Sequence, residues 1–366
     1  MTWTVAALVL FYCSWLVIML VAWRKLVRPG QLMSCDTGEP SLYYSVVIPF
    51  RNEAENLAAL VRSIRQEPFP RHAYEIILVN DHSTDNYCEV VEGLEGVRLL
   101  QLTEGQGKKR ALNLGILAAK GDVIVTTDAD CEVSKNWLGS LCYYFENCGA
   151  MFVSGAVTFQ PEQDGFQQMQ TIEFASLVGV GAASIQLKTP GMCNGANLAF
   201  KKEVFHEVGG YEDNDHLPSG DDEFLLHKIA TKYPGKVYFN TAPASFVKTQ
   251  PLDTFKQFVH QRKRWAGKWT YYSDLRNSLL AAFIGISNFS VLIALFYAFN
   301  GVHGMWVLIG IKLVLEGLFL NSVLQFVDKS LHLVYFLVLQ VIYPFYVVYF
   351  AVIANLGGYT WKGRQY

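Results

Sequence analysis

The chain has 366 residues, of which 51% are hydrophobic, and its formal net charge at pH 7 is only -2. A protein that tracks nucleic-acid phosphates normally carries a strong basic excess, so this balance argues against nucleic acid as a partner. Length and apolar content together predict one globular domain with several membrane-spanning segments. The seven cysteines are scattered without metal-site or disulfide spacing, which favours reduced thiols.

The chain begins with an apolar segment, Thr2–Trp23, which has the length that a helix needs to cross a bilayer. Arg24 and Lys25 follow it and no small-residue cleavage site does, so we expect residues 1–23 to be a transmembrane anchor. Further apolar runs predict three more spans within residues 278–356, followed by a short tail, residues 357–366. These runs are Ser278–Asn300, Met305–Phe326 and Leu331–Leu356.

Basic residues predict the orientation of these spans. Only four of the 30 Lys and Arg residues lie beyond Arg276, and none precedes Arg24. Positive charge concentrates on the cytoplasmic side of membrane proteins, so the central domain, residues 44–276, is expected in the cytoplasm. Four spans then place the Trp361–Arg364 tail outside, although its charges favour the cytoplasm.

Between the membrane segments, short β-rich runs alternate with helical patterns. Four runs are predicted as strands: Ser45–Ile48, Glu75–Asn80, Arg98–Gln101 and Asp122–Thr126. Four intervening segments are predicted as helices: Glu53–Gln66, Asp85–Glu92, Lys108–Ala119 and Ser134–Glu146. This alternation predicts an α/β fold with a mainly parallel sheet, whose ligands bind beyond the carboxyl ends of the strands. Phe166–Leu187 is partly apolar, but its polar first half favours a buried or interfacial helix over a span.

Acidic residues follow two of the predicted strands. Asp128 and Asp130 are one residue apart, so both can face one hard cation and the diphosphate that it bridges. Asp81 ends the second strand, where a carboxylate can accept hydrogen bonds from a base or a ribose. For Asp85, capping of the helix that follows is the alternative. A stray Asp-x-Asp is more often a solvated turn, so these motifs depend on their context.

Two further polar clusters lie farther along the chain. Gly105–Arg110 opens a helix whose free N–H groups and cations favour phosphate, with a solvated basic turn as the alternative. Ser219–Glu223 contains three successive carboxylates before another helix. We expect Asp222 to be a general base, with Asp221 and Glu223 only capping the helix or tuning its charge.

A basic aromatic segment, Gln261–Trp269, precedes the second span. Arg262, Lys263 and Lys268 are expected to do no more than anchor the chain at anionic headgroups. Arg264 could instead neutralise a departing diphosphate, and the Trp265 ring could face a sugar. Within the third span, Lys312 and Glu316 are spaced for pairing on one helix face, which favours mutual neutralisation over a functional charge.

In this order, the motifs resemble those of the family 2 glycosyltransferases with a GT-A fold, a group that includes cellulose, chitin and hyaluronan synthases and ceramide glucosyltransferases. The resemblance extends from about Tyr44 to Trp265. It rests on Val47-Ile48-Pro49 with Asn52-Glu53, Asp81, Lys108 in Gly-Lys-x-x-Ala-Leu-Asn, Asp128-Ala129-Asp130, Asp221-Asp222, and Gln261-x-x-Arg264-Trp265.

The resemblance implies a role for each matching residue. The donor, a nucleotide-sugar and most simply a UDP-sugar, would be bound by Pro49, Glu53, Asp81, Lys108, Asp128 and Arg264. Asp130 would serve a divalent metal, Mg or Mn. Asp222 would be the catalytic base, and Gln261 and Trp265 would bind the acceptor. The Asn194–Phe200 segment resembles the loop beneath the sugar.

The resemblance also implies the reaction, an inverting and metal-dependent sugar transfer without an enzyme nucleophile. The expected acceptor is a membrane lipid or a lipid-linked glycan, and a processive polysaccharide synthase is the alternative. An inactive nucleotide-sugar-binding scaffold or transporter is an alternative of another class. A sugar nucleotidyltransferase is disfavoured, because its first loop should be rich in glycine.

Overall fold

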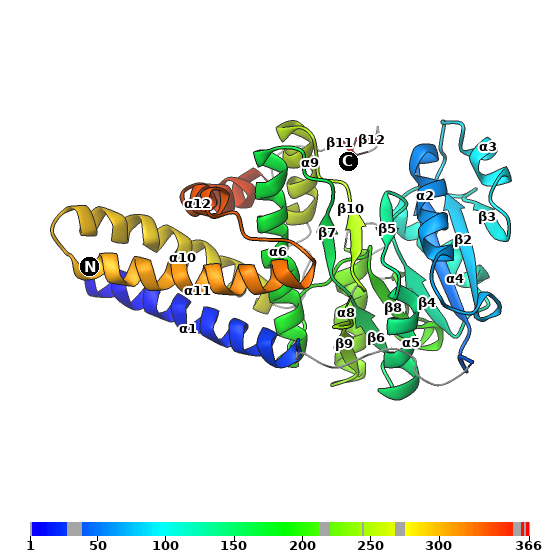
Figure 1. The fold of residues 1–366 in the computed structure, drawn as a ribbon, viewed down its shortest axis with the longest axis horizontal. Helices are drawn as coiled ribbons and strands as arrows, with labels where there is room; N and C mark the ends of the chain where they lie inside the picture. The colour runs from blue at the N-terminus through cyan, green and yellow to red at the C-terminus, as the bar shows by residue number, and fades with distance from the viewer. Residues whose placement is uncertain are drawn as a thin grey trace. The chain divides into compact units, whose positions relative to one another are not determined.

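The computed structural model describes residues 2–27, 39–212, 220–243, 245–267, 275–353, 360–361 and 364–365. The chain divides into two compact units, and the boundary falls within one long helix, α6 (Gly165–Gln186). The sheet unit comprises Leu26–Pro161 and Val180–Pro251. The helical unit comprises Met1–Lys25, Glu162–Gly179 and Leu252–Tyr366. Figure 1 shows the elements of each unit along the chain.

A seven-stranded sheet forms the centre of the sheet unit, with the order β3-β2-β1-β4-β8-β6-β9. Its strands are β1 (Tyr44–Phe50), β2 (Tyr74–Asn80), β3 (Val97–Gln101), β4 (Val123–Thr126), β6 (Phe152–Ser154), β8 (Leu198–Lys201) and β9 (Val237–Phe239). All neighbours pair in parallel except β8, which is antiparallel to both β4 and β6. The predicted mainly parallel sheet is therefore confirmed.

The order of the first four strands reverses at β1. The chain passes from β1 to β2 and β3 on one side, and then returns to β4 on the other side of β1. Loops at such a switch point leave the sheet in opposite directions, which opens a place for ligands. The loops after β1 and β4 flank this point, and they contain Glu53, Asp128 and Asp130.

Helices join these strands and pack on the sheet. They are α2 (Ala54–Arg65), α3 (Tyr87–Glu92), α4 (Lys108–Ala118), α5 (Trp137–Asn147), α7 (Lys202–Glu207) and α8 (Asp221–Lys232), with a short 3₁₀ helix at Arg71–Ala73. A smaller sheet has the order β5-β10-β7, with β5 (Cys131–Val133), β7 (Val157–Phe159) and β10 (Val247–Thr249). The small sheet was not predicted.

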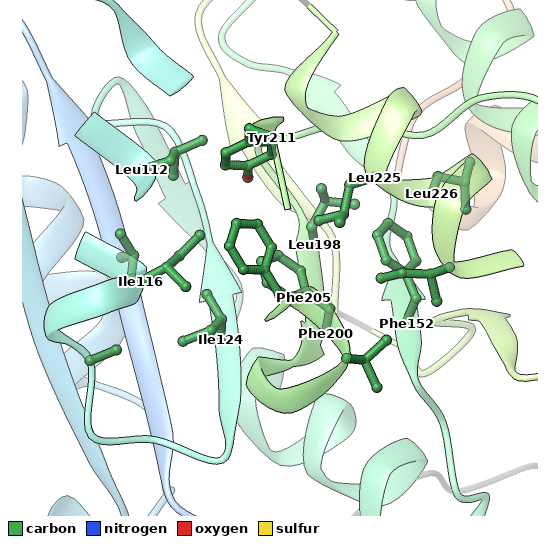
Figure 2. Close-up of a cluster of buried hydrophobic side chains, with 14 of the residues drawn as sticks. Leu112, Ile116, Ile124, Phe152, Leu198, Phe200, Phe205, Tyr211, Leu225 and Leu226 are labelled. Atoms are coloured by element: carbon green, nitrogen blue, oxygen red, sulfur yellow. The ribbon is translucent and has the colours of Figure 1, made fainter. Parts of the chain in front are cut away.

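One apolar cluster joins α4, α7 and α8 to the sheet (Figure 2). Phe200 of β8 and Phe205 of α7 stack with their ring centroids 5.6 Å apart, and Tyr211 meets Phe205 edge-on at 5.0 Å. Leu112 and Ile116 of α4 belong to the same cluster. Burial of this apolar surface holds the amino ends of α4 and α8 in place, and both of those ends carry predicted site residues.

The helical unit contains α1 (Thr2–Leu26), the first part of α6, α9 (Phe255–Ala266), α10 (Leu275–Phe299), α11 (Gly304–Phe326) and α12 (Leu333–Ile353). Two residue pairs, Thr360–Trp361 (β11) and Arg364–Gln365 (β12), form a short antiparallel ladder. Among the described residues, four helices are long and apolar enough to cross a membrane, namely Thr2–Leu26, Ala282–Phe299, Gly304–Phe326 and Leu333–Ile353. They match the four predicted spans, although residues 354–356 lie outside the described part.

Two charged residues of α11 in the helical unit are paired. Lys312 and Glu316 of α11 form the predicted ion pair, with 2.5 Å between Nζ and Oε2, and Lys312 also donates to Gln340 of α12. Lys312 is buried, with 2% of its surface exposed. Mutual neutralisation of this pair is therefore confirmed, which explains how a charged side chain is tolerated in an apolar helix.

Candidate functional site

Asp81 lies at the end of β2 and holds the start of α4. Its side chain is almost fully buried, and its carboxylate accepts a hydrogen bond from the backbone N–H of Gly107 at 3.1 Å. Gly107 is the residue before α4, and its φ of +107° suits glycine far better than any other residue. The same carboxylate lies 3.2 Å from Nδ1 of His82. Asp81 thus positions the helix end from which Lys108 projects.

The loops after β1 and β2 lock together. Asn52, at a positive φ of 53°, accepts the Thr84 N–H at 2.8 Å and donates its own N–H to Ser83. Asp85 accepts the N–H of Ala54, the first residue of α2, at 2.8 Å. Asp85 therefore caps α2 and not the helix that follows it, because α3 begins at Tyr87 and has Asn86 at its N-cap.

Pro49 and Glu53 also lie on this side of the sheet unit. Pro49 is buried within β1 opposite Val79, beyond the stretch of β1 that pairs with β4. Its missing N–H therefore interrupts no hydrogen bond to β4. Glu53 is buried at the N-cap of α2, where its carboxylate accepts the Asn56 side-chain amide at 2.5 Å.

Lys108 is the centre of the charged cluster. Its ammonium lies 2.6 Å from a carboxylate oxygen of Asp128 and 3.7 Å from one of Asp221. Burial by itself would lower the pKa of Lys108, but the neighbouring carboxylates outweigh this effect and hold the pKa above its ordinary value. Lys108 is consequently charged at neutral pH. It joins three segments that are far apart in the sequence.

Gly195 brings Asp222 into the same cluster. Its backbone N–H donates to Oδ2 of Asp222 at 2.9 Å, and its carbonyl accepts the Thr126 hydroxyl at 2.9 Å. A Cβ atom at position 195 would lie only 3.2 Å from Nζ of Lys108. The absence of a side chain at Gly195 therefore lets the loop approach the charges closely.

Asp221 makes a contact with Lys108 that the sequence did not predict. It was expected to cap α8 or tune its charge, yet it lies within 4 Å of Lys108 and makes no N-cap hydrogen bond, since Gly220 occupies the N-cap. The proximity of Asp221 and Asp222 in sequence was the available signal. What sequence could not show was that Lys108 lies beside both. Ser219 falls outside the described residues.

Asp128 and Asp130 follow β4, with Ala129 buried between them. Both aspartates are half-buried, and Oδ1 of Asp130 lies 3.8 Å from Sγ of Cys131. Across the described ranges, no group of three or more His, Cys, Asp or Glu side chains gathers to hold a metal ion. One or two carboxylates at a strand end nevertheless fit Mg²⁺ or Mn²⁺, because such ions take oxygen ligands and complete their shell with waters and diphosphate oxygens.

The remaining predicted residues, Gln261, Arg264 and Trp265, lie on α9 in the helical unit and are half-buried. A capping box at Thr254 and Gln257 fixes the start of this helix. Arg262 corrects an expectation. It was expected to be a headgroup anchor, but it is only 3% exposed and pairs with Glu173 of α6. Lys268 lies outside the described residues.

Comparison with known proteins finds a family match for part of the chain. Residues 45–209 match the sequence profile described as "Glycosyl transferase family 2". The chain is 28% identical over 192 residues to Glycosyltransferase AglE of Haloferax volcanii, which covers 49% of this chain and 59% of the relative. It is 24% identical over 247 residues to the beta-monoglucosyldiacylglycerol synthase of Nostoc sp., covering 65% of this chain and 51% of the relative.

A solved structure resembles almost the whole chain. The mannosyltransferase PcManGT of Pyrobaculum calidifontis, solved in complex with GDP-Man and Mn²⁺, matches with a TM-score of 0.62 at 18% identity, covering 97% of this chain and 99% of that one. The chain spans about three fifths of the length of the first curated relative. The strand order and this likeness agree on a GT-A fold, and within that fold residues 45–209 match glycosyl transferase family 2.

Proposed function

We propose that the chain transfers a sugar from a nucleotide-sugar to a membrane lipid or lipid-linked acceptor, with inversion and with the help of a divalent metal. The observation that carries this proposal is the cluster around Lys108, in which Asp128, Asp221, Asp222 and the Gly195 backbone gather beside the switch point of the sheet. Such a place is where ligands bind in open α/β sheets.

Donor binding is assigned to the loops after β1, β2 and β4 and to the start of α4. The Lys108 ammonium is held by the Asp128 carboxylate, and its charge suits a diphosphate. Asp81, Glu53 and Pro49 are assigned to the nucleotide. The structural neighbour bound GDP-Man, so GDP-mannose is a donor to test beside the UDP-sugars that the family resemblance suggests.

The proposed metal is Mg²⁺ or Mn²⁺, held by Asp130 and by Asp128. When bound, it would supply positive charge against the departing diphosphate. Arg264 of α9 is the second cation assigned to that diphosphate. The ion pair between Lys108 and Asp128 supports this assignment. It shows that the Asp128 carboxylate can bind a cation, and a carboxylate supplies the charge and the oxygen atoms that Mg²⁺ or Mn²⁺ requires.

Asp222 is assigned as the general base. Its two oxygens accept backbone N–H groups of Gly195 and Glu223, each at 2.9 Å, and these two bonds orient the carboxylate. In the proposed reaction, the acceptor oxygen bonds to the anomeric carbon as the bond from that carbon to the diphosphate breaks. The acceptor's hydroxyl proton passes to Asp222, and the nucleoside diphosphate leaves.

A lipid acceptor is favoured by the four apolar helices and by the similarity to a diacylglycerol-glucosylating relative. Gln261 and Trp265 are assigned to the acceptor. Membrane association and a cytoplasmic catalytic domain, residues 44–276, remain part of the proposal. A processive polysaccharide synthase is the alternative product class that the family resemblance leaves open.

The purified protein in detergent tests this proposal with radiolabelled UDP-glucose, UDP-N-acetylglucosamine and GDP-mannose, each with diacylglycerol or a total membrane lipid extract. The expected result is metal-dependent release of nucleoside diphosphate together with label in a lipid of discrete mass. Label in a long polymer would favour the synthase. Binding of a donor without release or transfer under any of these conditions would favour the inactive scaffold and contradict the proposal.

A further inference from the structure

Arg262 is a buried cation between three helices of the helical unit. Its Nη2 lies 2.5 Å from Oε2 of Glu173 on α6, and both side chains are almost completely enclosed. The other carboxylate oxygen of Glu173 accepts the hydroxyl of Tyr346 on α12 at 3.0 Å. One carboxylate therefore ties α9 and α12 to α6. Another buried ion pair of this unit, Lys312 with Glu316, lies on a single helix.

Arg262 also touches both residues assigned to the acceptor. Its Nη1 donates to the side-chain oxygen of Gln261, and its guanidinium carbon lies 4.3 Å from the ring centroid of Trp265. One turn earlier in α9, the ring centroid of Phe258 lies 4.5 Å from the guanidinium carbon. Trp265 is further packed against Phe174, the neighbour of Glu173 in α6, at 6.0 Å. The orientation of Gln261 and Trp265 thus depends on where Arg262 is held.

The pairing must be maintained for this arrangement to persist. Burial disfavours a cation, but the Glu173 carboxylate outweighs this and raises the pKa of Arg262, which stays charged. Breaking a buried ion pair by removing one partner is far more damaging than its net contribution to stability suggests, because the other charge remains buried. The planar guanidinium can also stack on a ring while it binds a carboxylate, which an ammonium cannot do.

We propose that Arg262 and Glu173 are positioning residues for sugar transfer, and that together they hold Gln261 and Trp265 in the orientation that receives the acceptor. This inference rests on the proposed function, because it assigns a cause to the placement of the acceptor residues. Neither residue touches the reacting atoms. Each acts through α9.

Glu173→Gln and Arg262→Lys test the inference, with Glu316→Gln as the matched control. The control also neutralises one acid of a buried ion pair in the helical unit, but its partner is Lys312. With UDP-glucose or the donor found active and diacylglycerol as acceptor, both test variants should raise the acceptor KM by about tenfold or more. Their donor KM and acceptor-independent donor hydrolysis should stay within about twofold of the wild type. The control should leave all three unchanged.

Arg262→Lys separates charge from stacking. It keeps the positive charge but loses the planar group over Trp265, so its acceptor KM should still rise above that of the wild type. In the double variant Arg262→Lys with Trp265→Ala, the rise in acceptor KM should be smaller than the product of the two single rises, because Arg262 acts partly through that ring. Additive effects, or a normal acceptor KM in Arg262→Lys, would overturn the inference.

A second measurement does not require activity. Hydrogen exchange of peptides covering Phe255–Ala266 should accelerate in Glu173→Gln and remain at the wild-type rate in Glu316→Gln. Unchanged exchange in α9 of a folded Glu173→Gln protein contradicts the inference. If the wild type transfers no sugar from any donor, the proposed function fails instead, and the exchange comparison still decides whether Arg262 and Glu173 position α9.

Discussion

Asp221 and Asp222 are neighbours in the chain but make different contacts. Asp221 faces the ammonium of Lys108 at 3.7 Å, whereas Asp222 accepts the Gly195 N–H at 2.9 Å. Asp221 therefore forms an ion pair with Lys108, whereas each oxygen of Asp222 accepts a backbone N–H group. This difference is the residue-scale reason for assigning the base to Asp222.

Asp222→Asn is expected to keep the fold and donor binding but to lose transfer. The amide has almost the same shape and can still accept the Gly195 N–H through its oxygen, but it cannot take the acceptor's proton. Loss of a general base typically costs about 10²–10⁴-fold in rate. The measurement is the turnover number with saturating donor and acceptor, beside the dissociation constant of the donor.

The matched controls are Asp221→Asn and Glu223→Gln, which make the same change from acid to amide at the two neighbouring carboxylates. Both should reduce turnover less than Asp222→Asn does, because neither removes the proposed proton acceptor. All variants need equal unfolding midpoints in detergent, since a destabilised protein would also lose turnover. An equal loss in all three variants would refute Asp222 as the single base.

Asp130→Ala should abolish the metal dependence of donor binding. Without this carboxylate the diphosphate keeps its negative charge but the proposed bridging cation loses a protein ligand. Titration of the wild type and the variant with UDP, with and without Mn²⁺, measures the effect directly. Wild-type affinity and metal dependence in Asp130→Ala would remove this residue from the proposed metal site.

The sequence motifs predicted candidate site residues that lie close together, but they did not predict all the neighbours of these residues. Lys108, Asp128 and Asp222 were singled out by motif, and they do lie together in the sheet unit. Arg262 was mistaken for a surface anchor, because its partner Glu173 is 89 residues away and only tertiary packing brings them together. Asp85 was assigned to the wrong helix for the same reason: it caps α2, which is earlier in the chain.

At the scale of elements, the start of α5 is held by the buried side chain of Glu67. Glu67 accepts the backbone N–H groups of Trp137 at 3.0 Å and Leu138 at 2.9 Å, which are the first two residues of the helix. The first N–H groups of a helix have no partner within that helix, so the Glu67 side chain takes the place of an N-cap side chain. Burial raises the pKa of Glu67 to about 8, although the hydrogen bonds from the helix start oppose the shift.

This shift predicts a pH dependence of stability. Between the ordinary value of 4.5 and about 8, the unfolded chain binds fewer protons at Glu67 than the folded chain does. The free energy of unfolding should therefore fall as pH rises through this window, by up to about 1.4 kcal/mol per pH unit from this group. Glu67→Gln keeps an acceptor oxygen but cannot titrate, so its stability should change less over the same range.

Thermal unfolding midpoints of both proteins at pH 5, 6, 7 and 8 measure this contribution as the difference between the two curves. Other titrating groups affect the wild type and the variant alike and cancel in that difference. A wild-type midpoint that rises relative to Glu67→Gln as pH increases would show that the helix N–H groups lower the pKa more strongly than burial raises it.

Strands with a clear local apolar pattern were predicted, whereas very short strands were not. β1, β2, β3 and β4 were found within two residues of their bounds, because each is a short apolar run bounded by polar loops. β5, β7 and β10 have three residues each, and β10 pairs with strands about 90 and 115 residues before it. No local pattern contains such a pairing, so the small sheet emerged only in the folded chain.

At the scale of the whole molecule, each of the two units is made of segments that are separated in the sequence. The helical unit collects its first helix, part of α6 and everything beyond Leu252, whereas the sheet unit takes the segments between them. Hydropathy identified the apolar helices correctly, since length and composition alone define them. It could not assign Glu162–Gly179 to the helical unit, because this segment is held there by polar contacts such as Glu162 with Lys329 and Gln170 with Leu252.

Membrane topology is the prediction that involves the whole chain. Basic residues concentrate between the first and second spans, so the sheet unit is expected in the cytoplasm and the tail outside. Cys88 is exposed on α3 of the sheet unit and offers a native reporter. A membrane-impermeant maleimide should label it in inside-out vesicles but not in intact cells, and the Cys88→Ser variant identifies the part of the signal that belongs to this thiol.

The tail provides the opposite arm of the same experiment. With four spans, a cysteine that replaces Gln365 in the Cys88→Ser background should be labelled in intact cells, because an even number of crossings returns the chain to the side where it began. Labelling of both positions from the cytoplasmic side would mean that one apolar helix does not cross. The proline within α12, Pro344, makes this helix the first to test, since it interrupts the helical hydrogen bonds that a lipid-exposed backbone requires.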